Sequence, residues 1–158
     1  MSFFIDTVCK YFTNLIETRK GKIDMDRKDG IRWIVGRDST ESAEFEIRER
    51  TLIIHMKEDL DHHNALYIRE YADKKMVTKN IQNVIFDFSQ VTFMDSSGIG
   101  VILGRYKKLR LLGSGKLAVT GVCDCVNRIL TMSGLYGIVD KYKDLSDAFA
   151  HMNELGGR

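Results

Sequence analysis

From residue 43 onward the chain alternates short apolar runs with amphipathic stretches, and this alternation restricts the fold more than any other feature of the sequence. Residues 43–48 alternate apolar and charged side chains strictly, which is typical of a half-buried strand. Further strands are predicted at 52–56, 83–88, 116–120 and 138–139. Helices are predicted at about 62–79 after an Asp61 cap, at 97–112, around Val126–Leu130 before Gly134, and after an Asp144 cap.

Strands that alternate with helices imply parallel strands joined by crossovers. The strands at 43–48 and 52–56 are too close in sequence for a crossover, so they either pair antiparallel or occupy distant positions in the sheet. The sequence therefore predicts an α/β fold in which helices pack on a mixed sheet.

The chain divides near residue 42 into an N-terminal extension, 1–42, and a main domain, 43–158. The extension carries an apolar stripe at helical spacing, formed by Phe4, Val8, Tyr11, Phe12, Leu15 and Ile16, and a short strand is predicted at 31–35. The stripe must be buried against the protein's own core or against a second copy. The extension is thus the candidate element for a homodimer.

Composition excludes several classes of function. The 158 residues carry a net charge of +2, without the excess of Lys and Arg that marks a protein that binds nucleic acid. The three cysteines, an odd number at these spacings, do not make a disulfide framework and, with no second ligand pair, do not predict a metal site. No apolar run is long enough to span a membrane, and no signal peptide is recognisable, so we expect a cytoplasmic protein without a metal or other cofactor.

The segment Val91-Thr-Phe-Met-Asp-Ser-Ser-Gly-Ile-Gly100 lies between a predicted strand end and a helix start, and it holds the residues most suited to a functional role. Asp95, Ser96 and Ser97 are all good N-cap residues, and Gly98 and Gly100 remove side-chain bulk from the first turn. Free N–H groups and the positive end of the helix dipole suit such a terminus to an anion. The simplest interpretation is that these residues only cap and pack the helix.

Three functional interpretations stand beside that one. A serine nucleophile is disfavoured because the glycine two residues before it is missing and no Asp–His pairing is evident among His55, His62, His63 and His151. A nucleotide phosphate loop is disfavoured because the Gly-Lys-Ser/Thr pattern is absent. The third interpretation is a phosphoacceptor at Ser96, where a phosphate would add about −1.5 to −2 charges beside Asp95 and change the sign of a partner surface.

The segment Phe93-Met-Asp-Ser-Ser-Gly-Ile-Gly-Val-Ile-Leu-Gly-Arg-Tyr106 closely resembles the phosphorylation-site segment of STAS-domain anti-sigma-factor antagonists of the sporulation type. Leu60-Asp-His-His63 resembles the start of that family's first helix, and Met132-Ser-Gly-Leu135 resembles the end of its third. The order and spacing of the three segments also fit, and the resemblance covers about residues 43–153.

The resemblance implies a mixed sheet of four to five strands with about four helices mainly on one face, and no catalysis. It implies that the unphosphorylated protein binds an anti-sigma factor that is also a serine kinase and so frees a sigma factor. The kinase would then phosphorylate Ser96 and a serine phosphatase would reset the protein. The partner-binding residues implied are Asp61, Asp95, Ser97, Gly98, Ile99 and Gly100.

This sequence departs from the family in two places. Glu58-Asp59 stands where the family has Gly-Glu or Gly-Asp, so a glycine able to adopt positive φ is lost before the first helix. The second departure is the extension, 1–42, for which we recognise no relative. Three alternatives to the antagonist stay open: a STAS module in another signalling scaffold, a nucleotide-binding protein, and a purely structural oligomer.

Overall fold

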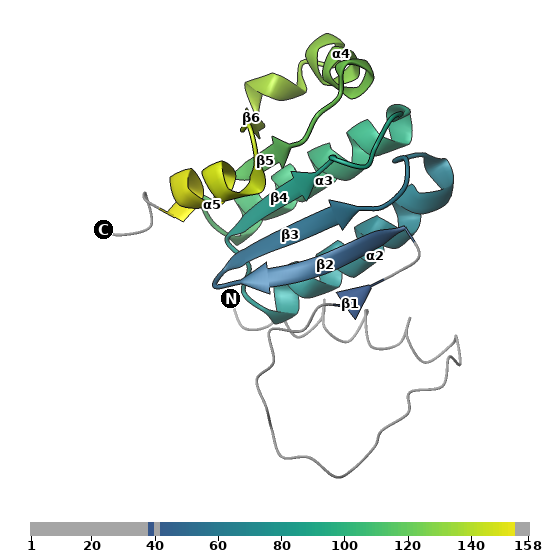
Figure 1. The fold of residues 1–158 in the computed structure, drawn as a ribbon. Coiled ribbons are helices and arrows are strands. Elements are labelled where there is room, and N and C mark those ends of the chain that lie inside the picture. The colour runs from purple at the N-terminus through teal and green to yellow at the C-terminus, as the bar shows by residue number, and fades with distance from the viewer. Residues whose placement is uncertain (1–37, 40–41, 154–158) are drawn as a thin grey trace, which may run out of the picture. The chain divides into compact units, whose positions relative to one another are not determined.

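The computed structural model describes residues 38–39 and 42–153, which form a six-stranded sheet with helices on both faces (Figure 1). The strands lie in sequence order across the sheet: β1 (Asp38–Ser39), β2 (Ala43–Arg48), β3 (Thr51–Met56), β4 (Asn83–Asp87), β5 (Leu117–Thr120) and β6 (Asp140–Lys141). The helices are α2 (His62–Thr78), α3 (Ser96–Leu112), α4 (Asp124–Met132) and α5 (Leu145–Asn153), with a 3₁₀ turn, η1, at Leu135–Gly137.

The predicted mixed α/β sheet is confirmed. β1, β2 and β3 pair antiparallel, whereas β3, β4, β5 and β6 pair parallel. The two close strands, β2 and β3, therefore pair with each other, through a turn in which Glu49 adopts a positive φ of 54°. The predicted apolar stripe and the strand at 31–35 lie outside the described residues, and of the 1–42 extension the structure describes β1 and Ser42.

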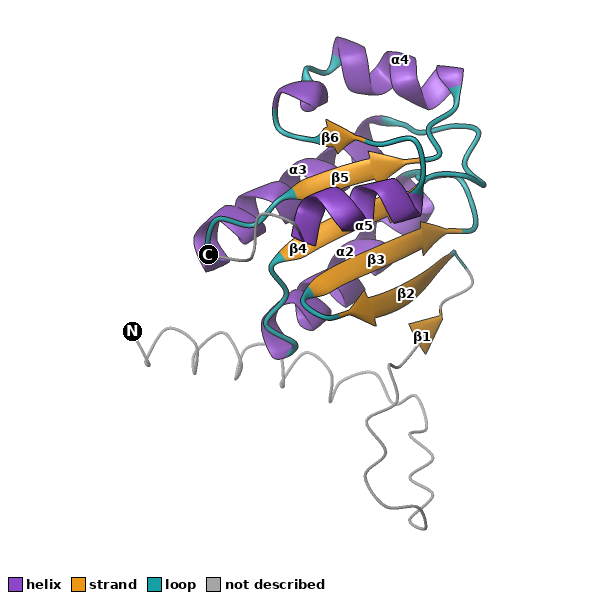
Figure 2. Ribbon diagram, turned by 60° about the vertical axis from the view of Figure 1, so that its left-hand side comes forward, coloured by secondary structure: helices purple, strands orange, loops and turns teal. Residues whose placement is uncertain are grey.

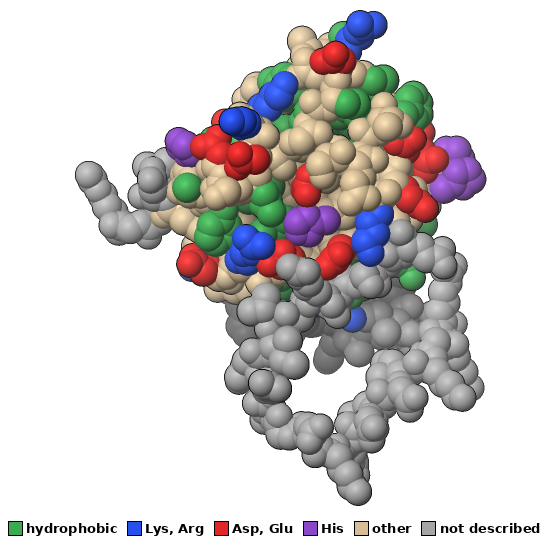
Figure 3. Space-filling view, viewed as in Figure 1, with side chains coloured by type: hydrophobic (Ala, Val, Ile, Leu, Met, Phe, Trp, Pro, Cys, Tyr) green, Lys and Arg blue, Asp and Glu red, His purple; other side chains and the backbone are tan. Residues whose placement is uncertain are grey.

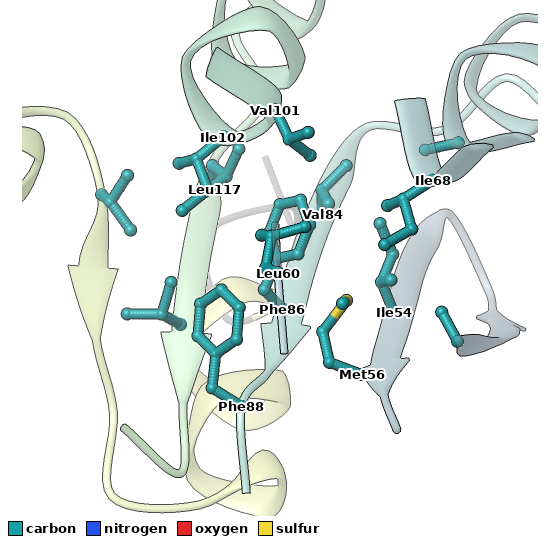
Figure 4. Close-up of a cluster of buried hydrophobic side chains, with 14 of the residues drawn as sticks. Ile54, Met56, Leu60, Ile68, Val84, Phe86, Phe88, Val101, Ile102 and Leu117 are labelled. Carbon is teal, nitrogen blue, oxygen red and sulfur yellow. The ribbon is translucent and has the colours of Figure 1, made fainter. Parts of the chain in front are cut away.

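The main core lies between one face of the sheet and the helices α2, α3 and α4 (Figure 4). Alternate residues of β3 and β4, such as Ile54 and Phe86, point into this core together with Ile68 of α2 and Ile102 of α3. The other face carries α5, whose Ala148 and Met152 pack on a smaller cluster formed by Ile53, Ile85 and Ala118 (Figure 2). The prediction that the helices lie mainly on one face is confirmed, and α5 is the exception.

The predicted edge strand at 138–139 is wrong by two residues, because β6 is Asp140–Lys141. The backbone N–H groups of Ile138 and Val139 both donate to the carbonyl of Leu135, at 3.0 Å each, and so close η1 instead of joining the sheet. Val139 is buried in the main core, so its apolar side chain fits the pattern that a strand residue would also show.

The face of the sheet beside α5 carries a charged cluster over β2 and β3, where red and blue side chains surround a histidine in Figure 3. His55 Nδ1 lies 2.9 Å from an Asp87 carboxylate oxygen, and His55 Nε2 lies 3.3 Å from Glu46. Burial raises the pKa of Asp87, but hydrogen bonds from His55 and Ser89 outweigh it and leave the pKa below its ordinary value. This Asp–His pairing was not evident from the sequence, because the partners come from neighbouring strands and lie 32 residues apart.

Candidate functional site

The loops that follow β3 and β4 lie side by side at the edge of the sheet toward which the parallel strands point (Figure 1). Leu60 and Met94 form a parallel β-bridge between the two loops. The Leu60 N–H donates to the Phe93 carbonyl, and the Asp95 N–H donates to the Leu60 carbonyl, each at 3.3 Å. These bonds place the starts of α2 and α3 next to each other, because each helix begins directly after its loop.

A single carboxylate reinforces this bridge. Asp59 accepts hydrogen bonds from the backbone N–H groups of Thr92 at 2.8 Å and Phe93 at 2.9 Å, and from the Thr92 hydroxyl at 3.1 Å. The backbone bonds from Thr92 and Phe93 lower the pKa of Asp59 below its ordinary value, against a smaller opposing effect of desolvation. Asp59 therefore holds the second loop in place by its backbone, whatever side chains that loop carries.

Each helix start is capped by an aspartate, but the two caps differ. Asp61 accepts from the N–H groups of His63 and Asn64 within its own helix, α2. Asp95 accepts from Ser97 N–H of α3 at 2.7 Å and, with its other oxygen, from His62 N–H of α2 at 3.2 Å. The Asp95 carboxylate is thus shared by both helices.

The shared cap also keeps its charge. Desolvation raises the pKa of the Asp95 carboxyl, but hydrogen bonds from the N–H and hydroxyl of Ser97 and from the backbone of His62 and Gly98 outweigh it. The pKa of Asp95 consequently lies below its usual range. The positive ends of two helix dipoles favour the same ionised form.

The candidate phosphoacceptor lies in the first turn of α3, directly after this cap. Ser96 is the first residue of the helix and is exposed, whereas Ser97 is partly buried. Gly100, one turn further on, is exposed, and an added Cβ would meet no atom within 4 Å. Ile99 is half-buried and packs on the core. The helix start that the sequence predicts is confirmed and begins one residue earlier, at Ser96.

Gly98 differs from the other residues of the predicted partner surface because it is buried. A Cβ at this position would lie 2.3 Å from Met94 Cγ, 2.7 Å from Met94 Sδ and 3.0 Å from Leu60 Cγ. The glycine lets α3 approach the Leu60–Met94 bridge closely, so its role is to pack the two loops and not to face solvent.

The imidazole of His62 lies beside the shared cap, with its Nδ1 3.7 Å from Asp95 Oδ2. This contact is a second Asp–His pair that sequence reasoning missed. Among the residues described, no serine hydroxyl of α3 hydrogen-bonds a histidine. In the same part of the chain, no three His, Cys, Asp or Glu side chains are placed to hold a metal ion.

The surroundings of Ser96 combine acidic and apolar character. Segments 58–68, 88–104 and 121–127 contain no Lys or Arg but hold five carboxylates, namely Glu58, Asp59, Asp61, Asp95 and Asp124. Cys123 joins the third segment to this edge, because its Sγ lies 3.7 Å from the Thr92 carbonyl. Phe93 is 49% exposed, and on α2 Leu66 and Tyr67 are 56% and 61% exposed.

The loop that lacks the expected glycine is accommodated without strain. Glu58 is not among the described non-glycine residues with positive φ, which are Glu49 and Asn80. Its carboxylate accepts from Ser42 Oγ at 3.2 Å and from Asn64 Nδ2 at 3.4 Å. Glu58 therefore links the loop to the start of β2 and to the first turn of α2.

Comparison with known proteins identifies the family. Residues 42–148 match the STAS domain. The chain belongs to the STAS-domain family. Over 109 residues, the STAS domain is 36% identical to the anti-sigma F factor antagonist of Paenibacillus polymyxa, which covers 69% of this chain and 92% of that protein. It is 32% identical over 98 residues to the anti-sigma-B factor antagonist of Listeria monocytogenes, covering 60% of this chain and 84% of the relative.

Solved structures show the same STAS fold. The anti-sigma factor antagonist SpoIIAA in its unphosphorylated form has a TM-score of 0.57 and 22% identity, covering 73% of this chain and 99% of its own. The Bacillus protein SpoIIAA in its phosphorylated form has a TM-score of 0.58 and 24% identity, covering 69% and 97%. A STAS-domain protein of Planctomyces limnophilus has a TM-score of 0.61 at 16% identity, covering 72% and 99%. Within the described part of the STAS protein, no helix is long and apolar enough to cross a membrane.

Proposed function

We propose that this STAS protein is an anti-sigma-factor antagonist that works by binding and not by catalysis. In its unphosphorylated form it binds an anti-sigma factor that is also a serine kinase, and so frees a sigma factor in the cytoplasm. Phosphorylation of Ser96 ends this binding, and a serine phosphatase restores it. The observation that carries the proposal is an exposed serine at the start of α3, on an edge whose segments hold carboxylates and no Lys or Arg.

The charges explain how one phosphate would end binding. A phosphoserine at 96 adds about −1.5 to −2 charges next to the ionised Asp95. The start of α3 stabilises that charge within the free protein. A partner that covers the same surface would instead bury the phosphate with no Lys or Arg from these segments to pair with it, which is costly.

The exposed apolar side chains support a protein partner. Phe93 lies directly before Met94 of the Leu60–Met94 bridge, and Leu66 and Tyr67 lie in the second turn of α2. Gly100 presents no side chain one turn after Ser96, so a partner backbone can approach this part of α3 closely. The relatives are named as anti-sigma factor antagonists, and one solved structure with this fold is that of SpoIIAA in its phosphorylated form, which agrees with such a switch.

The nucleotide-binding alternative is less well supported. A nucleotide phosphate would use the free N–H groups at the start of α3, but the Asp95 carboxylate already accepts from Ser97 N–H, so fewer donors are left for it. That alternative requires nucleotide affinity that survives Ser96→Ala, and titration with ATP and GTP would reveal it.

The first test of the proposed function is phosphate mapping by mass spectrometry on protein purified from its source cells, with and without a stress that activates a sigma factor. We expect phosphate on Ser96 with an occupancy that changes between the conditions. In binding assays with the anti-sigma-factor kinases of the same genome, Ser96→Ala should bind persistently in the presence of ATP. Protein carrying phosphoserine at 96 should lose at least about tenfold in affinity.

Ser114→Ala is the matched control, because Ser114 is an exposed serine just after the opposite end of α3. It should leave phosphorylation and release intact. The proposal is wrong if phosphate is never found on Ser96 in abundant protein, or if phosphoserine at 96 leaves binding to every candidate kinase unchanged.

A further inference from the structure

His62 belongs to α2 and Ser96 belongs to α3. His62 nevertheless lies beside Asp95, the cap residue that directly precedes Ser96. Its backbone N–H donates to Asp95 Oδ2 at 3.2 Å, and its imidazole Nδ1 lies 3.7 Å from the same oxygen. Its side chain is 69% exposed, so the ring is free to turn toward a group that extends from the first turn of α3. The hydrogen bond to Asp95 fixes the backbone of His62, and only the ring needs to move.

The charge pattern makes this imidazole important. The three segments at this edge hold no Lys or Arg, so the imidazoles of His62 and His63 are the only side chains in them that can carry a positive charge. The two rings contact each other, with centroids 3.9 Å apart. The carboxylate beside the His62 ring is that of Asp95 from α3. The other carboxylates near these histidines in the sequence are Asp61 at the cap of α2, and Glu58 and Asp59 in the preceding loop.

We propose that His62, as an imidazolium, pairs with the phosphate of phosphorylated Ser96 and so makes the charge of the modified surface depend on pH. The inference rests on the proposed function for the choice of Ser96 as acceptor. In the unphosphorylated protein the ring lies near Asp95, and after modification the phosphate dianion is the stronger attraction. His63 contributes through its contact with the His62 ring and not by direct pairing.

The consequence is a graded switch. The ordinary values, near pH 6 for the second ionisation of a phosphoserine and near pH 6.5 for a free histidine, set the range in which these charges are expected to change. Above that range the surface carries a dianion next to Asp95 and a neutral imidazole. Below it, a monoanion faces an imidazolium, and the charge that opposes a partner falls. Acidification should therefore weaken the effect of phosphorylation on binding.

The test is a pH titration of the full chain carrying phosphoserine at 96, incorporated during translation, so that no kinase is needed. Phosphorus NMR follows the phosphate, and proton NMR follows the assigned ring of His62. An imidazolium favours the dianion and the dianion favours the imidazolium. We expect the second ionisation of the phosphate to shift to higher pH by a few tenths of a unit in His62→Gln, as for an exposed ion pair.

Two variants serve as controls. His63→Gln should shift the phosphate titration less than His62→Gln does, and His151→Gln should not shift it, because His151 pairs with Asp147 on α5 at the other face of the sheet. Identical phosphate midpoints in the wild-type and His62→Gln proteins would overturn the inference, as would a His62 midpoint that phosphorylation leaves unchanged. Because the phosphate is installed without a kinase, these outcomes are independent of whether cells phosphorylate Ser96.

Discussion

The helices α2 and α3 are joined in two different ways along their length. At their starts, next to Ser96, carboxylates of Asp59 and Asp95 accept from backbone N–H groups of the opposing segment. Further along, Arg105 of α3 is 3% exposed and forms an ion pair with Asp73 of α2. Side-chain-to-backbone bonds do not require a particular side chain on the other segment, so the functional end is held while its surface stays free to serve a partner.

At the other, buried end of the contact between α2 and α3, the helices are joined by specific side chains. Arg105 Nε lies 2.8 Å from Asp73 Oδ1, and Arg105 Nη2 lies 3.1 Å from Asp73 Oδ2. Lys108 Nζ lies 3.4 Å from the same Asp73 oxygen. Burial lowers the pKa of Arg105, with an opposing effect of Asp73, so this carboxylate offsets part of the cost of burying the guanidinium charge.

The largest expected effect is therefore at the buried end. Asp73→Ala leaves a buried guanidinium unpaired and should lower the free energy of unfolding by about 3–5 kcal/mol. Urea unfolding at pH 7 measures it. The double variant Asp73→Leu/Arg105→Met removes both charges and should lose less than the single variant does. A loss below about 1 kcal/mol for Asp73→Ala would show that the pair is not buried as described.

A glycine pair separates packing from exposure at the functional end. Gly98→Ala should lower the free energy of unfolding by about 1–2 kcal/mol, because its Cβ would lie 2.3 Å from Met94 Cγ and this overpacking outweighs the gain in helix propensity. Gly100→Ala adds the same methyl group where nothing lies within 4 Å, and should raise the free energy of unfolding by up to about 1 kcal/mol.

Urea unfolding of both variants gives this comparison directly, since the two positions lie two residues apart on one helix. Kinase binding should rank the two variants in the opposite order. Gly100→Ala should weaken kinase binding although it does not destabilise the protein, because the added side chain is exposed beside Ser96. Equal unfolding free energies for the two variants would contradict the close approach of α3 to the Leu60–Met94 bridge.

The glycines also show what the sequence could and could not predict. Periodicity placed the four main strands, β2 to β5, and the helices, and the run Asp95-Ser96-Ser97 correctly predicted the start of α3, because caps and apolar spacing are local properties. The burial of Gly98 was not predictable, because it depends on Leu60 and Met94, and Leu60 comes from a different loop.

The ties between the loops were missed for the same reason. Asp59 bonds to residues 33 and 34 positions away, and Asp95 bonds to His62 across 33 positions, so no spacing rule connects them. The one available signal was the pair of acids, Asp59 and Asp61, immediately before a helix that needs only one cap. An acidic residue left over after the cap is assigned is a reasonable candidate for a bond to a neighbouring loop.

The smallest expected effect concerns this leftover acid. Asp59→Asn keeps an acceptor oxygen but loses its charge, and should lower the free energy of unfolding by about 1 kcal/mol at pH 7. The pKa of Asp59 is depressed in the folded protein, so its contribution is complete above the ordinary carboxyl pKa near 4. It is then lost as the pH falls through the depressed folded value.

The stability difference between the wild-type and Asp59→Asn proteins should hence stay constant from pH 7 to about pH 5 and shrink below pH 4. Urea unfolding over this range measures it, with Glu58→Gln as the control at the neighbouring exposed carboxylate. A difference that grows on acidification would have the wrong sign for a carboxylate that accepts from backbone N–H groups. Such a result would mean that only the Leu60–Met94 bridge and the Asp95 cap hold the two loops together, and that the Asp59 carboxylate does not stabilise this edge.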